Sequence, residues 1–218
     1  FDNLHYALNF PTKNLPDSTW VDLCAETWKP SDGRQKIHYS QQSTDGKPGA
    51  HSRTIAINGF LEYMAPLAGR TLDVMLEVKD KNLSAVKCML CLAENPRIDA
   101  LEREWACYKY AVLEHSQHHY QRIRSLLNDK TGYPAVAFYN LVESALEHPV
   151  DIGSAANAAM HVWGYFKKEV PEQSKAEFER LLKGYMAGQV SLERLKRLLY
   201  KHAQAYDENY LLQSYYFE

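Results

Sequence analysis

Apolar and polar positions alternate with a period of two in two short stretches of the first half of the chain. Residues 35–40 place Lys36, His38 and Ser40 on one face of a strand, and residues 72–78 place Met75 and Glu77 on one face and an apolar set on the other. Helical periodicity before, between and after these stretches predicts helices at about 17–28, 52–68 and 82–93. Residues 1–9 read as a strand running into a loop. This order favours parallel strands with helices outside them.

The pattern changes near residue 96, and no strand is expected after it. Helical periodicity covers 97–128 as one long stretch, then 134–146, 153–168, 171–186 and 191–206, before an apolar tail that is too hydrophobic to stay in solvent. We therefore predict an α/β domain at 1–95 followed by an all-α domain at 96–218.

Composition excludes several classes of protein. The chain has 218 residues with 45% hydrophobic residues and a net charge of −2, so a core is expected and no basic excess points to nucleic acid. No apolar run approaches the roughly 20 residues of a membrane span. Four cysteines fit a reduced, cytoplasmic protein, and we interpret Cys88 and Cys91 as packing residues. Because the chain begins with Phe1 at what resembles a strand end, we expect a fragment that starts inside a domain.

Oxygen and nitrogen donors gather at the ends of the expected strands. They are Asp2, His5, His38, His51 and Glu77. Such mixed sets suit transition metals, and carboxyl ends of parallel barrel strands are where catalytic sites lie. The plainer interpretation is that each is an ordinary polar residue at a strand end, and spacing alone does not separate the two.

The same positions carry a resemblance to a known family. The pieces FD (1–2) with His5, KIHYS (36–40), HS (51–52) and MLEVKDK (75–81) resemble, in order, the C-terminal part of the UV damage endonuclease family, over residues 1–93. The resemblance implies metal-site roles for Asp2, His5, His38, His51 and Glu77. It also implies catalytic roles for Glu77 and for Lys36, which matches an active-site lysine of the family. Where the family often has two adjacent histidines, this chain has Leu4 and His5.

The resemblance also implies a fold and an activity. The fold would be the C-terminal part of a TIM barrel, whose other strands would come from upstream sequence or from another chain. The activity would be metal-dependent DNA-repair cleavage on the 5′ side of UV photoproducts in double-stranded DNA, in the bacterial cytoplasm at the nucleoid. Manganese is the metal expected, with Zn²⁺ or Mg²⁺ as alternatives.

The helical half resembles a second family, the YbgA-like domain of unknown function DUF1722, over residues 103–218. The pieces that carry it are WACYKY (105–110), EHSQHHY (114–120), NAAMHVWGYFKK (157–168) and YLLQSYY (210–216). Its His115 and His119 have a helical spacing that metals use, but no glutamate lies between them. Its basic and aromatic residues suit either a nucleic-acid surface or a helical core with a charged rim.

Two other functions stay open at this point. The chain could be a non-catalytic adaptor that binds nucleic acid or protein through the helical half. It could also be a different metal enzyme on the same barrel, such as a sugar isomerase, although the KIHYS piece speaks against this.

Overall fold

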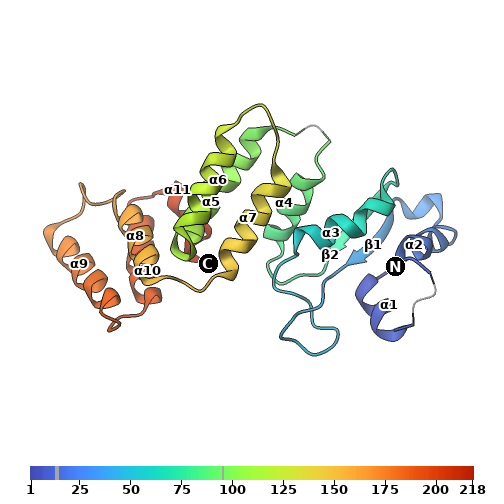
Figure 1. Cartoon of the computed structure of the whole chain (residues 1–218), viewed down its shortest axis with the longest axis horizontal. Helices are drawn as coiled ribbons and strands as arrows, with labels where there is room; N and C mark the ends of the chain where they lie inside the picture. Colours follow the sequence, from blue (N-terminus) through green and yellow to red (C-terminus); the bar gives the residue numbers. More distant parts are fainter. Residues whose placement is uncertain (13–14, 95) are drawn as a thin grey trace. The chain divides into compact units, whose positions relative to one another are not determined.

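The computed structural model describes residues 1–12, 15–94 and 96–218, and the chain divides into two compact units, 1–94 and 95–218 (Figure 1). The first unit combines a small parallel sheet with helices. Among its described residues, the second unit has helices as its secondary-structure elements and no strand. The class α/β followed by all-α is thus observed.

Two parallel strands form the sheet of the first unit. β1 (Gln35–Tyr39) pairs with β2 (Leu72–Leu76), and Ile37 lies opposite Val74. The start of the chain runs along the other edge of β1, where Asp2 and His38 form a parallel bridge and the His38 N–H donates to the Phe1 carbonyl at 2.8 Å. The parallel order expected from the alternating pattern is confirmed. The helical elements of this unit are α1 (Asn3–Asn9), α2 (Asp17–Ala25), η1 (Pro30–Asp32), α3 (Ile57–Met64), η2 (Ala65–Leu67) and α4 (Asn82–Cys91).

One face of this sheet is packed and the other is open. Ile37 and Tyr39 are buried against the helices, where Ile37 joins Val21 and Leu67 in a small core. Lys36 is exposed on the opposite face, and Met75 is 56% exposed. The donors found at the strand ends therefore lie beside the open face of the sheet.

The expectation of a strand running into a loop at residues 1–9 was wrong after Asp2. Residues 3–9 form α1, because the Asp2 carboxylate accepts the His5 backbone N–H at 2.9 Å and so caps the helix. Leu4 is the buried residue of α1. Asp2 accepts a hydrogen bond from a free N–H of the first turn, and this favours a helix more strongly than the short alternating pattern favours a strand.

The helix expected at 52–68 begins later, at Ile57. Side chains take the backbone N–H groups before it: the Ser84 hydroxyl accepts from Ile55 at 2.9 Å, and the Gln41 amide oxygen accepts from Ala56 at 2.7 Å. These distant partners satisfy the backbone in an extended conformation, so the helix starts only after them.

The second unit contains the helices α5 to α11 and a short 3-10 turn. They are α5 (Ile98–His115), α6 (Gln117–Asn128), α7 (Ala135–Glu147), α8 (Ile152–Trp163), α9 (Glu172–Met186), α10 (Leu192–Ala205), α11 (Asn209–Leu212) and η3 (Tyr215–Phe217). The single helix expected at 97–128 is broken at Ser116, whose backbone is extended (φ −157°) and whose hydroxyl accepts the His119 N–H. A serine cap inside an apolar periodic stretch starts a new helix.

The core of the second unit lies between α5, α8 and α10. It contains Leu113, Val162, Leu195 and Leu199, all at most 1% exposed, and the tail residues Leu211 and Tyr216, both fully buried. The expectation that the apolar tail packs is confirmed. Within the described part of the chain, no helix is both long and apolar enough to cross a membrane.

Candidate metal centre

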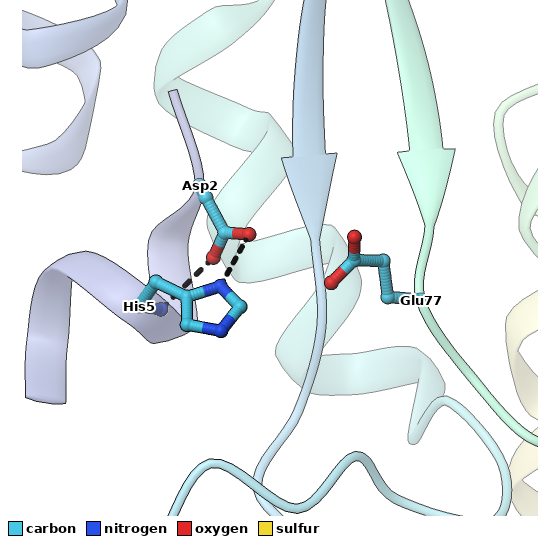
Figure 2. A group of neighbouring side chains, drawn as sticks. All are labelled: Asp2, His5 and Glu77. Carbon is cyan, nitrogen blue, oxygen red and sulfur yellow. Dashed lines mark hydrogen bonds and ion pairs between the residues drawn. The ribbon is translucent and has the colours of Figure 1, made fainter.

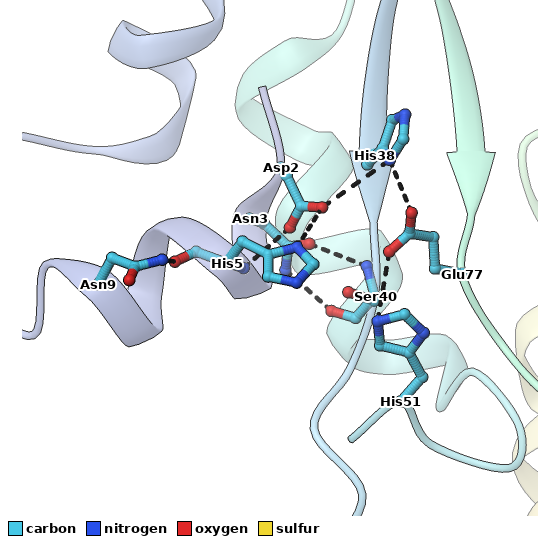
Figure 3. A network of polar contacts seen from close by, with 8 residues as sticks. All are labelled: Asp2, Asn3, His5, Asn9, His38, Ser40, His51 and Glu77. Carbon is cyan, nitrogen blue, oxygen red and sulfur yellow. Dashed lines mark hydrogen bonds and ion pairs between the residues drawn. The ribbon is translucent and has the colours of Figure 1, made fainter. Parts of the chain in front are cut away.

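The five predicted donors meet where the strands end. Asp2 lies beside His38 near the end of β1, and Glu77 follows β2, with its N–H donating to the Tyr39 carbonyl at 3.0 Å (Figure 3). These contacts hold the two carboxylates and the imidazole at one edge of the sheet. Parallel strands deliver their next residues to the same place, which is why positions far apart in sequence meet here.

Asp2 and His5 form a unit at the start of α1. One Asp2 oxygen caps the helix, and the other lies 2.8 Å from His5 Nδ1 (Figure 2). Partial burial would raise the pKa of the Asp2 carboxyl, but the hydrogen bonds from His5 outweigh it and hold that pKa below its usual value. The same hydrogen bond and the negative charge of Asp2 raise the pKa of His5.

Glu77 links the remaining two histidines. Its Oε1 lies 2.7 Å from His38 Nδ1, and its Oε2 lies 3.3 Å from His51 Nε2. His38 Nδ1 is also 3.8 Å from Asp2 Oδ2, so the network is continuous from His5 to His51 (Figure 3).

A closed loop delivers His51 to Glu77. His51 and Gln42 form an antiparallel bridge, and the Gln42 side chain spans the loop, accepting from the Gly49 N–H at 2.8 Å and donating to the Lys47 carbonyl at 3.0 Å. Gly49 has a φ of +86°, a conformation that glycine adopts at little cost and that lets the chain turn back before His51.

A residue that sequence reasoning did not single out fastens α1 to the sheet. The Asn3 side-chain amide donates to the Ser40 carbonyl at 2.9 Å and accepts the Ser40 N–H at 2.8 Å. Asn3 therefore fixes the position of Asp2 and His5 relative to β1 (Figure 3). An aspartate at the N-cap position was the sequence signal that could have placed α1 here.

Gln41 and Tyr39, which lie next to the site in sequence, use their side chains for hydrogen bonds within the fold. The Gln41 amide donates to the Tyr39 hydroxyl at 2.8 Å and to the Ala56 carbonyl at 3.0 Å. These side chains hold the start of α3.

The donor set fits a divalent metal ion. Ligand atoms of Asp2, His5 and Glu77 all lie within 4.8 Å of one another, and Glu77 Oε2 is a buried oxygen that accepts no hydrogen bond from the described residues (Figure 2). A buried carboxylate oxygen without a hydrogen bond is costly, and a cation would satisfy it. Carboxylates and imidazoles together are ligands that Mn, Fe and Zn accept. The metal role of these residues stays a prediction.

Lys36 does not join this network. It is exposed on β1, two positions before His38 and on the same strand face, and its side chain has no hydrogen bond or ion pair with the residues that the structure describes. Its catalytic role also stays a prediction.

The other candidate metal groups do not assemble. His115 ends α5 and bonds the His148 carbonyl through Nδ1, whereas His119 lies in α6 with its Nδ1 2.8 Å from the Ser116 hydroxyl. The break between α5 and α6 therefore removes the shared helix face on which metal binding by His115 and His119 would depend. Cys88 is buried, and no disulfide joins the four cysteines, all of which lie among the described residues.

The fold and the site together define an α/β protein with a candidate metal centre at the carboxyl ends of parallel strands, joined to a helical unit. Residues 1–109 match the family described as UV-endonuclease UvdE, and residues 109–218 match the protein of unknown function family DUF1722. The chain therefore belongs to the UV-endonuclease UvdE family, with a DUF1722 helical half, and both sequence resemblances are confirmed.

Curated relatives agree with this assignment. The chain is 32% identical over 201 residues to a protein named UV DNA damage endonuclease from Clostridium perfringens (strain 13 / Type A), covering 89% of this chain and 47% of that protein. It is 41% identical over 64 residues to a protein of Acanthamoeba polyphaga mimivirus whose name assigns it, provisionally, to UV-damage endonucleases, covering 28% of this chain and 19% of that protein. The chain thus spans at most about half the length of these relatives. No solved structure matches it.

Proposed function

We propose that this chain is part of a metal-dependent DNA-repair endonuclease that cuts the backbone on the 5′ side of UV photoproducts in double-stranded DNA. The observation that carries the proposal is the convergence of Asp2, His5, His38, His51 and Glu77 on one strand-end cluster, in a chain of the UV-endonuclease family. The relatives' names supply the substrate class. The bacterial nucleoid is the place of action that this substrate implies.

The cluster would hold one or more divalent ions, and manganese is our first choice. Asp2, His5, His38, His51 and Glu77 would be the ligands, and Asn3 would fix two of them through Ser40. A bound ion would supply Lewis acidity, which activates water and offsets charge on the phosphate.

The chain's own groups would position the DNA backbone. Lys36 projects from the open face of β1, two residues before His38, and its ammonium group would offset phosphate charge beside the cluster. Glu77 would keep His38 oriented through Oε1, and its Oε2, which accepts no hydrogen bond from the described residues, would be left for the ion. Extrusion of a damaged base, which is already weakly paired, would give lesion selectivity.

We further propose that additional strands complete a TIM barrel around this sheet. The 56% exposed Met75 and the exposed Lys36 lie on the face that a barrel would turn toward its interior. An open sheet edge is a surface that proteins normally cover. The additional strands would come from upstream sequence or from another chain.

The test uses the complete product of the gene that encodes this chain. A 5′-labelled duplex with one thymine dimer is incubated with Mn²⁺, Zn²⁺ or Mg²⁺, and the product length gives the cut position. We expect one cut on the 5′ side of the dimer and none in undamaged duplex.

Variants assign the cut to the cluster. Removal of a side chain that only supports a metal ligand lowers activity roughly 10- to 100-fold. We expect Glu77→Gln to lower the cutting activity by more than this. Glu62→Gln, an exposed carboxylate on α3, is the matched control and should cut as the wild type does. A wild-type protein that cuts neither duplex, or a Glu77→Gln variant with full activity, would contradict the proposal.

A further inference from the structure

A lysine of the helical unit is half-buried between aromatic rings. Lys109, on α5, has its Nζ 4.6 Å from the ring centroid of Tyr110 and 4.7 Å from that of Tyr210. Within the part of the chain that the structure describes, Lys109 has no carboxylate partner. Buried lysines are normally paired with an acid, so a lysine held by rings alone is unusual.

A second cation lies close to the first. Arg124, exposed on α6, is 5.8 Å from the ring centroid of Tyr120, and it too has no acidic partner among the described residues. Burial lowers the pKa of Lys109, and the positive charge of Arg124 lowers it further. Figure 1 shows α5 and α6 side by side in this unit. Two neighbouring cations that no carboxylate neutralises would be stabilised by an external anion.

Aromatic faces surround these cations. Tyr165 is 38% exposed, and its ring stacks on Tyr210 with a centroid separation of 5.8 Å and an interplanar angle of 15°. The Tyr110 hydroxyl donates to the Tyr165 hydroxyl at 3.2 Å, which fixes the exposed ring. On the other side, Trp105 packs against Tyr120 at 5.3 Å. The surface therefore offers flat, pre-positioned rings beside unneutralised positive charge.

We propose that this Lys109 surface, formed by Lys109, Tyr120, Arg124, Tyr165 and Tyr210 over the buried Tyr110, binds single-stranded nucleic acid. Phosphates bind between Lys109 and Arg124, and an unstacked base stacks on the Tyr165 ring. Single strands are bound by this combination of cationic and aromatic groups.

Other anionic partners use less of this surface. A duplex keeps its bases stacked on one another, so its phosphates would engage the cations but leave the rings uncovered. An acidic peptide would likewise use the charges alone. The site lies in the helical unit and needs no metal, so it goes beyond the proposed incision and is tested separately from it.

The test measures binding of the full chain to fluorescein-labelled oligothymidylate of about 12 nucleotides, a length within the site sizes of single-strand binders. Fluorescence anisotropy in EDTA excludes any metal-dependent cutting. We expect tighter binding to the single strand than to a duplex of the same length. Tyr165→Leu should weaken binding about 5- to 150-fold, the range for loss of one stacked base.

Charge removal gives a second readout. Lys109→Met keeps the length of the side chain and should lower the slope of log affinity against log salt by about 0.7, the value for one phosphate contact on a single strand. Lys109→Arg should restore the slope. The controls are Lys183→Gln, an exposed charge on α9, and Tyr200→Leu, a 40% exposed ring on α10, and both should bind within about twofold of wild type.

Several results would overturn the proposal. They are no binding to the single strand, tighter binding to the duplex, equal competition by a polyglutamate peptide, or folded Lys109→Met and Tyr165→Leu proteins that bind as the wild type does. Circular dichroism shows whether each variant is folded. None of these results depends on incision, which the Glu77→Gln comparison tests independently.

Discussion

The buried ion pair between α5 and α10 gives a sharp test of how the helical unit is held together. Glu114 is only 5% exposed, and its Oε1 lies 2.7 Å from Lys196 Nζ, which also lies over the Tyr216 ring at 4.3 Å. Glu114 Oε2 has no hydrogen bond with the described residues. Lys196 is therefore the main group that compensates this buried charge.

Lys196→Met removes the charge and keeps an apolar side chain over Tyr216. Breaking a buried pair by removing one partner costs about 3–5 kcal/mol, because the remaining charge is uncompensated. Replacing both members, in Glu114→Leu with Lys196→Met, should recover most of that loss, since two well-packed apolar residues cost little.

The cost should depend on pH in a known direction. Burial raises the pKa of Glu114 above 4.5, and the charge and hydrogen bond of Lys196 only partly offset this. A raised carboxyl pKa favours the folded state below the unfolded-state pKa, and this contribution is lost as pH rises through the folded-state pKa. The deficit of Lys196→Met should therefore be largest near pH 8 and shrink as pH falls toward 4.5.

Hydrogen exchange of peptides from α5 and α10 measures this deficit in the helical unit alone. Lys201→Met, an exposed lysine on the same helix, is the control and should change the opening free energy by less than about 0.5 kcal/mol. The reasoning is refuted if Lys196→Met matches this control at pH 8, or if its deficit grows as the pH is lowered.

Other predictions follow from single contacts. Asn3→Ala breaks both hydrogen bonds to Ser40 and should weaken Mn²⁺ binding about 10- to 100-fold by titration calorimetry, while unchanged affinity would remove its supporting role. Burial raises the pKa of Glu104, whose carboxylate accepts a hydrogen bond from the Tyr139 hydroxyl, so the stability of the wild type should fall as pH rises above 4.5. In urea unfolding, Glu104→Gln should flatten this dependence of stability on pH. An unchanged dependence would contradict the claim that Glu104 causes it. Ser116→Ala should cost about 1 kcal/mol, seen as faster exchange in the first turn of α6, and equal exchange would show that the cap is dispensable.

Sequence patterns predicted the elements whose position depends on residues close together in the chain. The alternation around Ile37 and Val74 placed both strands, because burial of one face follows directly from a period of two. The same reasoning failed at Asp2 and Ser116, where a single cap started a helix inside a pattern that read otherwise. Caps act through one hydrogen bond, which periodicity does not register.

The site was predictable in its members and not in its connections. The family resemblance named His51 and Glu77, but their separation of 3.3 Å depends on how the Gln42 side chain closes a long loop. The role of Asn3 likewise depends on its contact with Ser40, 37 positions away in the chain. Such contacts follow from tertiary structure, so no local pattern reports them.

The most direct test of the metal centre is Mn²⁺ binding by the complete gene product, followed by electron paramagnetic resonance, for wild type, Glu77→Gln and Glu62→Gln. If Glu77 is a ligand, its substitution should weaken binding by more than about tenfold, and the exposed Glu62 control should bind as the wild type does. Equal Mn²⁺ affinity and stoichiometry in Glu77→Gln and wild type would contradict the claim that this strand-end cluster holds the metal.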